Sequence, residues 1–301
     1  MHPLPTHTEA DGPHAGIVTV TLEQPGKPVV VLELDLIQRL EATLKALSPN
    51  VRGVVLASAS ERVFIAGADL KAVSELPDDQ LDDYLQYGSR VFALLANLPC
   101  PTVAAINGAA LGGGLELAMH CDGLVAAPPP ERDGQPGKPY PVGLPEAGLS
   151  ICPGWGGTNL LAARIDPAEG FRRTASGQPL LFSEAVEMRM FDAVAPSAAA
   201  LHHTAKDWLV TAKAGTLHRD GPPKRWIGRP NTAAACITAL DSVRAELPNT
   251  ASSHALIEAA DAGLTKGWQA ALAVERRRLI QLRNSNEGKA AIQAFFAKSK
   301  R

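Results

Sequence analysis

The first part of the chain alternates apolar and polar residues in a way that predicts strands separated by helices. Residues 16–22 alternate valine and leucine with threonine, which predicts a strand with one polar face. Apolar residues keep helical spacing over 35–47, and the apolar run 53–57 predicts a second strand. This strand, helix, strand order favours an α/β layer fold.

The alternation continues through the middle of the chain and then gives way to helices. An apolar segment enters Ala66-Gly67-Ala68-Asp69, a helix ends before Pro99, and a buried strand follows at 103–106. Residues 128–141 are rich in proline, glycine and charge, which predicts a surface loop. Beyond 167 the pattern is mostly helical. We expect helices over 197–214, 232–247, 253–283 and 287–300, and a linker over 215–230.

The first fifteen residues show none of this periodicity. They are polar, with no apolar core and no arginine, which argues against a signal peptide and predicts a disordered N-terminus over 1–15. His2, His7 and His14 lie there, and we interpret them as part of that disordered start rather than as metal ligands.

Composition narrows the class of protein. At 46% apolar and 20% charged residues the chain is globular, and its net charge of −2 argues against a nucleic acid held mainly by electrostatics. No apolar run approaches membrane-spanning length. The four cysteines have no CxxC or zinc spacing, so we expect packed thiols in a reducing compartment and a cytoplasmic location.

A glycine-rich stretch offers the first candidate chemistry. Gly112-Gly113-Gly114 follows a strand and opens a helix that carries Glu116. Free amides at such a turn could hold an oxygen that gains negative charge, and Glu116 lies near enough to share the site. The alternative is a glycine-rich turn in which Glu116 is an ordinary helical residue.

A second carboxylate lies in a similar setting. Glu146 follows Pro145 in an apolar stretch, where burial would raise its pKa toward that of a useful acid or base. The turn at 153–158 opens another helix with free amides. A surface turn is the competing interpretation of Pro145-Glu146.

Three motifs in this order and spacing, IAGADLK, NGAALGGGLELAMHCD and GLPEAGLSICPGWGGTNLL, resemble those of the enoyl-CoA hydratase/isomerase (crotonase) superfamily. The resemblance is close over 16–195, and the tail is similar to the helical end of the hydratase portions of fatty-acid oxidation proteins. It implies an α/β fold whose ββα repeats form a spiral core over 16–195 that carries the acyl-CoA site. A helical C-terminal trimerisation region over 196–301 would follow.

The resemblance also implies an active site, position by position. The oxyanion hole falls on the backbone amides of Ala68 and Gly113, and the two catalytic glutamates fall on Glu116 and Glu146. Gly154 matches the amide that orients water. The positions that contact substrate are Ala66, Gly67, Asp69, Leu70, Gly154 and Trp155, of which Ala66, Gly67 and Asp69 border the adenine end of coenzyme A.

These residue types suit the addition of water to a double bond. The reaction needs a base for the water, an acid for the α-carbon and donors for the oxygen that becomes negative. The resemblance therefore implies an enoyl-CoA hydratase, a lyase of fatty-acid β-oxidation that uses no metal or separate cofactor, since coenzyme A is part of the substrate. Two alternatives stay open: a Δ3,Δ2-enoyl-CoA isomerase, which needs only the glutamate matched by Glu146, and a non-catalytic acyl-CoA-binding protein.

The expected partners follow from the same resemblance. It implies a homotrimer or a dimer of trimers, and the apolar face of 290–296 has little else to cover it. Phe295 and Lys298 match positions that reach a neighbouring subunit's ligand. Because the chain has no GxGxxG dehydrogenase domain, a separate 3-hydroxyacyl-CoA dehydrogenase is the expected companion. We interpret the run Glu275-Arg276-Arg277-Arg278 as a solvated or inter-subunit face rather than an RNA-binding one.

The chain departs from the family pattern near the second carboxylate. Ser150 stands where glycine is usual, and Trp155 stands where a small residue is usual. Trp155 could narrow the acyl pocket, or it could pack against the neighbouring helix, and the sequence supports both interpretations equally.

Overall fold

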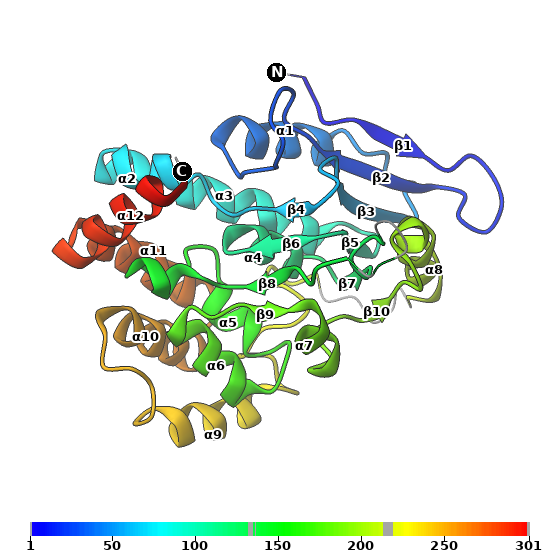
Figure 1. Ribbon diagram of the computed structural model, residues 1–301. Coiled ribbons are helices and arrows are strands. Elements are labelled where there is room, and N and C mark those ends of the chain that lie inside the picture. The colour runs from blue at the N-terminus through cyan, green and yellow to red at the C-terminus, as the bar shows by residue number, and fades with distance from the viewer. Residues whose placement is uncertain (1, 132–134, 136, 213–218, 300–301) are drawn as a thin grey trace.

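The computed structural model describes residues 2–131, 135, 137–212 and 219–299. Its strands form two sheets, and consecutive strands in the middle of the chain alternate between them (Figure 1). In three repeats the first strand joins a six-stranded sheet, the second joins a four-stranded sheet, and a helical segment follows. The predicted spiral of ββα repeats is therefore confirmed. The pairs are β3 (Gly53–Ser58) with β4 (Val63–Ile65), β5 (Thr102–Ile106) with β6 (Ala109–Leu111), and β7 (Gly123–Ala126) with β8 (Pro141–Gly143).

The larger sheet has the order β1-β2-β3-β5-β7-β10 and is parallel except at one edge. There β1 (Thr6–Thr8) runs antiparallel to β2 (Ile17–Leu22), while β10 (Ala193–Val194) forms the other edge. The smaller sheet has the order β4-β6-β8-β9, in which β9 (Leu180–Leu181) is antiparallel to β8. Parallel strands are usually covered on both faces, which explains why β3, β5 and β7 are continuous apolar runs.

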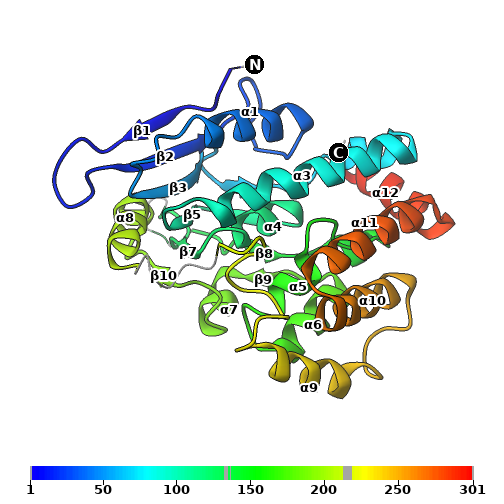
Figure 2. The same cartoon turned by 180° about the vertical axis from the view of Figure 1, so that it is seen from behind.

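Helices surround the two sheets (Figures 1 and 2). Among those of the described residues, none is both long and apolar enough to cross a membrane. Their bounds are α1 (Leu34–Lys45), α2 (Leu70–Glu75), α3 (Asp78–Asn97), α4 (Gly113–Met119), η1 (Glu146–Leu149), α5 (Gly157–Leu161), α6 (Pro167–Ser176), α7 (Phe182–Glu187), η2 (Ala198–Ala200), α8 (Leu201–Thr211), α9 (Ala233–Val243), α10 (Ala251–Lys266), α11 (Trp268–Asn284) and α12 (Asn286–Ser299), with η1 and η2 being 3₁₀ helices.

The six-stranded sheet buries both of its faces. Val55 and Ala57 of β3 pack in the cluster that includes Leu209 of α8, whereas Val54 and Leu56 enter the main core. This alternation follows from the two-residue period of a strand. Helix α8 thus closes the outer face of the sheet, and the remaining helices gather around the core on the other side.

The prediction of a disordered N-terminus is wrong for the described residues 2–15. Strand β1 pairs with β2, and Leu4 is buried in the core. The His14 ring nitrogen Nε2 lies 2.7 Å from Oδ1 of Asp207, which ties the segment before β2 to α8. The sequence pattern did not predict this strand, because β1 is an edge strand whose three side chains are all exposed and so shows no apolar alternation.

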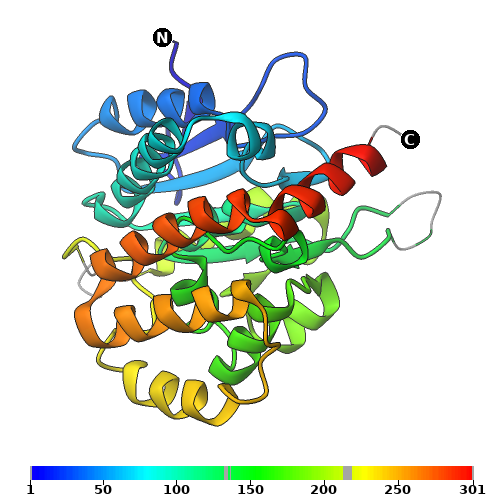
Figure 3. The same cartoon turned by 90° about the vertical axis from the view of Figure 1, so that its left-hand side faces the viewer.

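The prediction of one helix over 253–283 is also wrong. Gly267 adopts a positive φ of 92°, which ends α10 and lets the chain turn back as α11. Helix α11 then packs between α3 and α10 (Figure 3).

The terminal helix α12 packs against η1 and α2 of its own chain. Ile292 is 3% exposed and Phe296 contacts the main core, whereas Phe295 is 44% exposed. The expectation that this apolar face has little else to cover it is therefore wrong for Ile292 and Phe296, while the trimer stays a prediction.

Several predicted segments fall partly outside the described residues. These are residues 132–134 and 136 of the expected loop, 213–214 of the expected helix and 215–218 of the expected linker. The last strand, β10, ends at Val194, next to the expected boundary between the spiral and the helical region.

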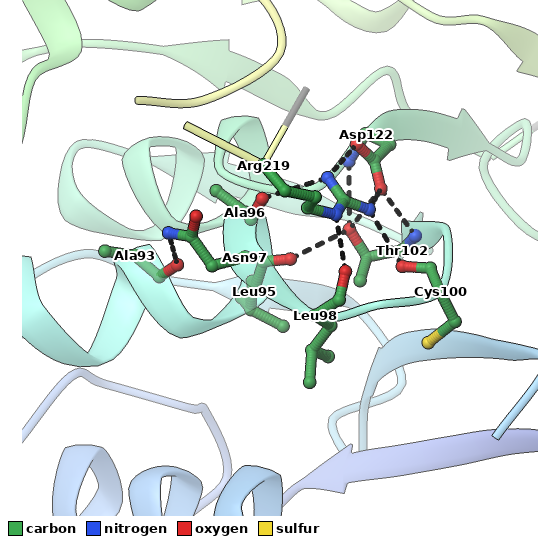
Figure 4. A network of polar contacts seen from close by, with 9 residues as sticks. All are labelled: Ala93, Leu95, Ala96, Asn97, Leu98, Cys100, Thr102, Asp122 and Arg219. Atoms are coloured by element: carbon green, nitrogen blue, oxygen red, sulfur yellow. Dashed lines mark hydrogen bonds and ion pairs between the residues drawn. The ribbon is translucent and has the colours of Figure 1, made fainter. Parts of the chain in front are cut away.

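A buried carboxylate joins three segments of the core. Asp122 accepts the Thr102 amide at 2.8 Å and the Arg219 guanidinium at 2.8 and 2.9 Å (Figure 4). Arg219 also donates to the carbonyl oxygens of Ala96 and Cys100, between the end of α3 and the start of β5. The side chain of Asp122 is only 1% exposed, so this buried carboxylate needs the counter-charge that Arg219 supplies.

We predict that Arg219→Met lowers the free energy of unfolding by ~3–5 kcal/mol, because it leaves the Asp122 carboxylate buried without its counter-charge. The matched control is Arg172→Met. Its pair with Glu246 has side chains that are 45% and 59% exposed, and water screens ion pairs this exposed, so they contribute little to stability. Urea denaturation of both variants measures the difference, and equal losses would contradict the assignment.

Candidate active site

The residues predicted to hold the reacting oxygen follow two neighbouring strands. Ala68 follows β4, and Gly113 opens α4 shortly after β6. Strands β4 and β6 are parallel partners, with Val63 opposite Ala109. Because parallel strands end at the same edge of a sheet, the two segments that carry these amides leave the sheet side by side.

Both of these amides lack an acceptor in the part of the chain that the structure describes. Among the described residues, neither the Ala68 nor the Gly113 N–H donates a hydrogen bond to another group. Gly112, just before α4, has a φ of 51°. An oxygen that gains negative charge is the kind of acceptor that such a pair of free donors suits.

Glu146 lies directly against the start of α4. A Cβ on Gly112 would stand 2.5 Å from Glu146 Oε1, so any larger residue at 112 would displace this carboxylate. The other oxygen, Oε2, is buried, and no described residue donates a hydrogen bond to it. Burial raises the pKa of Glu146 to about 8, which suits an acid that works near neutral pH.

Glu116 is fully inside the protein, on α4. Its Oε1 accepts the amides of Trp155 at 2.8 Å and Gly157 at 2.7 Å. Burial, then the charges of Glu275 and Glu146, raise the pKa of Glu116 well above its usual value, and the two amide bonds oppose the rise. Glu116 and Glu146 are thus close enough to titrate as a pair.

The turn that holds Glu116 also contains two of the other predicted residues. Gly154 precedes Trp155, and in the described part of the chain its amide donates to no other group. This free donor directly precedes the Trp155 amide that binds Glu116.

Trp155 packs into the helix layer. Its side chain is 1% exposed, its Nε1 donates to Leu85 O at 2.9 Å, and its ring meets Tyr84 edge to face. The ring also lies against the start of α4, because a Cβ on Gly113 would lie 2.4 Å from it. The structure therefore shows the packing contacts of the second interpretation, and the effect of Trp155 on the acyl chain stays a prediction.

The remaining predicted contact residues border the turn into α2. Ala66 is exposed and its amide donates to Val30 O at 2.8 Å, Gly67 has a φ of 137°, and Leu70 opens the helix. The Asp69 carboxylate caps α2 by accepting the Lys71 and Ala72 amides. Asp69 therefore shapes this turn, and its carboxylate is already engaged.

The sequence interpretation missed a third buried carboxylate. Glu275 on α11 is 1% exposed and accepts the amides of Gly156 and Thr158 at 2.6 and 3.0 Å. Its assignment to a solvated or inter-subunit face is wrong. The pattern did hold a signal, because Glu275 lies four residues after Ala271 and four before Leu279, which places it in the apolar stripe of its helix.

The other chemically reactive residues near the site are packed. Burial lowers the pKa of His120 to about 4, and its ring meets the rings of Phe92 and Trp268. Cys152 lies beside α11, with Sγ 3.7 Å from Glu275 O. All four cysteines are buried and free, which confirms the prediction of packed thiols.

Comparison with known proteins gives a family and a fold. The family model described as enoyl-CoA hydratase/isomerase matches residues 12–217. The human mitochondrial Δ3-Δ2-enoyl-CoA isomerase has 21% identity and a TM-score of 0.67, with 96% of each chain covered. The enoyl-CoA hydratase from Bacillus halodurans has 20% identity and a TM-score of 0.65, covering 96% of this chain and 99% of that one. The enoyl-CoA hydratase from Bacillus anthracis has 24% identity and a TM-score of 0.59, covering 94% and 93%.

We predict that the protein loses stability as the pH rises from 4.5 to 8, in part because of Glu146. The pKa of Glu146 in the folded protein, about 8, exceeds the ordinary value of 4.5, so between these pH values the folded state binds more protons than the unfolded state. The free energy of unfolding therefore falls as the pH rises through this range, and the fall ends once the pH exceeds the folded-state pKa. Glu146→Gln should flatten the decline by up to ~1.4 kcal/mol per pH unit. Urea denaturation at several pH values tests this, with the exposed Glu187→Gln as the control. Wild-type and Glu146→Gln curves that run parallel would contradict it.

Proposed function

Because the chain belongs to the enoyl-CoA hydratase/isomerase family, we propose that it is an enoyl-CoA hydratase that adds water reversibly to 2-enoyl-CoA thioesters and yields 3-hydroxyacyl-CoA. The observation that carries this proposal is the pair of buried carboxylates, Glu116 and Glu146, on either side of an unused donor at Gly113. Hydration needs an acid and a base at once, and two carboxylates with raised pKa values can supply both.

The proposed mechanism begins with the thioester carbonyl. The amides of Ala68 and Gly113 donate to this oxygen and stabilise the negative charge that it gains when water attacks carbon 3. Losing one donor of this kind typically costs ~10²–10³ in rate. The double bond between carbons 2 and 3 thereby moves to between carbons 1 and 2, and carbon 2 must receive a proton to restore the carbonyl.

The two glutamates divide the proton transfers. The pKa of Glu116 is also raised, but its two amide bonds oppose the rise, whereas Oε2 of Glu146 has no donor among the described residues. We therefore assign the negative charge of the pair to Glu116, which takes the proton from the attacking water. Glu146, whose pKa of about 8 keeps it protonated at neutral pH, delivers its proton to carbon 2. The proton then passes from Glu116 back to Glu146 when product leaves, and the Gly154 amide orients the water.

A cleft supports the proposal of a coenzyme A thioester. The cleft has a volume of ≈ 760 Å³ and is lined by Val30 and by charged residues of both signs, among them Lys27, Arg62, Glu23 and Glu61. Lys27 also forms an ion pair with Glu33. It adjoins the turn into α2, since Ala66 N donates to Val30 O. Coenzyme A carries phosphates, and cationic side chains bind phosphates well. We propose that Lys27 and Arg62 meet these phosphates while Ala66 and Gly67 border the adenine.

The alternative activity is Δ3,Δ2-enoyl-CoA isomerisation. It is favoured by the buried Glu146 oxygen that has no donor among the described residues, because a single carboxylate can move a proton between carbons 2 and 4. A non-catalytic acyl-CoA-binding role would leave the raised pKa values of both glutamates without use.

The wider setting is part of the proposal. We propose a homotrimer or a dimer of trimers, with coenzyme A arriving as part of the substrate and no other cofactor, in the cytoplasm. A separate 3-hydroxyacyl-CoA dehydrogenase would consume the product, as in β-oxidation.

We predict that Glu116→Gln and Glu146→Gln each lower hydration at least ~10²-fold while coenzyme A binding stays near normal. Glutamine at 116 keeps an oxygen for the amides of Trp155 and Gly157, so the turn is preserved. The assay uses a series of 2-enoyl-CoA and 3-enoyl-CoA thioesters of increasing length, with the products separated, and Glu187→Gln as the control.

The two variants also separate the candidate functions. Wild-type turnover of 2-enoyl thioesters in either variant would overturn the two-glutamate mechanism. Isomerisation that survives Glu116→Gln but not Glu146→Gln, in a protein that hydrates nothing, would instead establish the alternative.

We predict that Trp155→Ala raises kcat/KM for longer 2-enoyl thioesters relative to crotonyl-CoA. The ring backs Gly113, so its removal opens space beside the bound carbonyl, and each methylene buried there is worth ~0.8 kcal/mol. The ring is also core, so the variant should lose ~3–5 kcal/mol of stability. Trp208→Ala, which removes a partly buried ring of α8 on the other face of the six-stranded sheet, is a control for lost packing alone. An unchanged length profile in a destabilised Trp155→Ala protein would assign the ring to packing only.

A further inference from the structure

Four consecutive amides at the start of α5 alternate between two buried carboxylates. The amides of Trp155 and Gly157 donate to Glu116, at 2.8 and 2.7 Å. The amides between and after them, of Gly156 and Thr158, donate to Glu275, at 2.6 and 3.0 Å. Bonds from N–H groups to a charged carboxylate are among the stronger hydrogen bonds in proteins. The two glutamates therefore hold the turn 155–158 from opposite sides.

Glu275 reaches this turn because of how α11 is oriented. The arginines after it pair with acidic residues of other helices: Arg276 with Asp82 of α3 at 2.6 Å, and Arg278 with Glu258 of α10 at 2.8 Å. These outer ion pairs lie on both flanks of α11. Glu275 itself points inward, and its side chain is the charged group that α11 brings to the proposed active site.

A second contact from α11 fixes the same turn. Gly156 has a φ of 99°, and a Cβ there would lie 2.2 Å from the Trp268 ring. The left-handed conformation at Gly156 allows neighbouring amides to point in different directions. Helix α11 thus holds the turn with one ring and one carboxylate.

We propose that Glu275 is a positioning residue for the proposed hydration: it holds the amides of Gly156 and Thr158 so that those of Trp155 and Gly157 fix the carboxylate of Glu116 beside Glu146. This inference rests on the proposed function for its reaction. Glu116 accepts from two residues of the turn, so a turn that moves carries this carboxylate with it. A displacement of about 1 Å at a reacting group can cost ~10²-fold in rate.

Glu275 also acts on the catalytic pair through its charge. The titratable groups that face it are Glu116 on α4, Glu146 on η1 and Cys152, and Arg278 lies on its own helix. After burial, the Glu275 charge is the first cause of the raised pKa of Glu116, and it also raises that of Glu146. Removing this charge should lower both pKa values.

The test compares Glu275→Gln with Glu275→Asp in the full-length protein. Glutamine removes the charge and one of the two acceptor oxygens, whereas aspartate keeps the charge but shortens the reach to the turn. Glu246→Gln, which removes the same charge from an exposed ion pair that does not involve α11, is the matched control. The measurements are kcat and KM for crotonyl-CoA across pH, and hydrogen exchange of the peptide that contains 155–158.

For Glu275→Gln we expect kcat to fall ~10–10²-fold, with KM within about threefold of wild type. Both limbs of the pH profile should move to lower pH, because the neighbouring carboxylates lose a like charge. Glu275→Asp should lose kcat without this movement, and exchange at the turn should quicken in both variants. Glu246→Gln should match the wild type in every measurement.

Several outcomes would overturn the proposal. One is a folded Glu275→Gln protein with wild-type kcat and an unshifted pH profile, and another is faster exchange with unchanged kcat. If Glu275→Gln does not fold, Glu275→Asp decides alone, and wild-type kcat there counts against positioning.

The failure of the proposed function looks different. A wild-type protein that converts none of the thioesters would overturn the hydratase proposal. Exchange at the Trp155 and Gly157 amides then decides whether Glu275 positions Glu116: quicker exchange in the variants supports it, and unchanged exchange overturns it.

Discussion

Two buried carboxylates that share the amides of one short turn, Glu116 and Glu275, are the constraint on which this structure depends. A buried charge is costly unless donors or counter-charges surround it. Here the donors are backbone amides, and only a glycine-rich turn between a loop and a helix can offer four in succession. The helices α4 and α11 must pack where their glutamates can reach this turn. The same hydrogen bonds therefore determine both how these helices pack and where the carboxylates lie.

The spiral explains why the parts of the site arrive from distant segments. Each repeat sends one strand to each sheet, and the loops that leave the smaller sheet lie side by side. Ala68 follows the second strand of one repeat, Gly113 that of the next, and Glu146 that of the third. Because each repeat adds one strand to the smaller sheet, the three segments that follow these strands lie next to one another along one edge of that sheet.

Much of the fold was predictable, because buried parallel strands and amphipathic helices leave strong periodic patterns. Strand β1 was not, since an edge strand with exposed side chains leaves no apolar pattern. The break at Gly267 was not, because one glycine inside a long helical pattern is compatible with continuation. For the candidate site, the motifs placed Glu116 and Glu146, but Glu275 was hidden by the three arginines after it. A charged residue in an apolar helical stripe is recognisable, yet its partner amides lie more than a hundred residues earlier in the chain and cannot be read from local pattern.

The closing of the turn by α11 has a consequence for how the protein is made. On a ribosome, the strands and the two glutamates proposed to be catalytic emerge well before α11. A nascent chain that has emerged only through β10 already contains the turn, Glu116 and Glu146, but the amides of Gly156 and Thr158 have no carboxylate to accept them. The spiral can assemble in order of synthesis, whereas completion of its active site waits for a helix translated long after the residues that it orders.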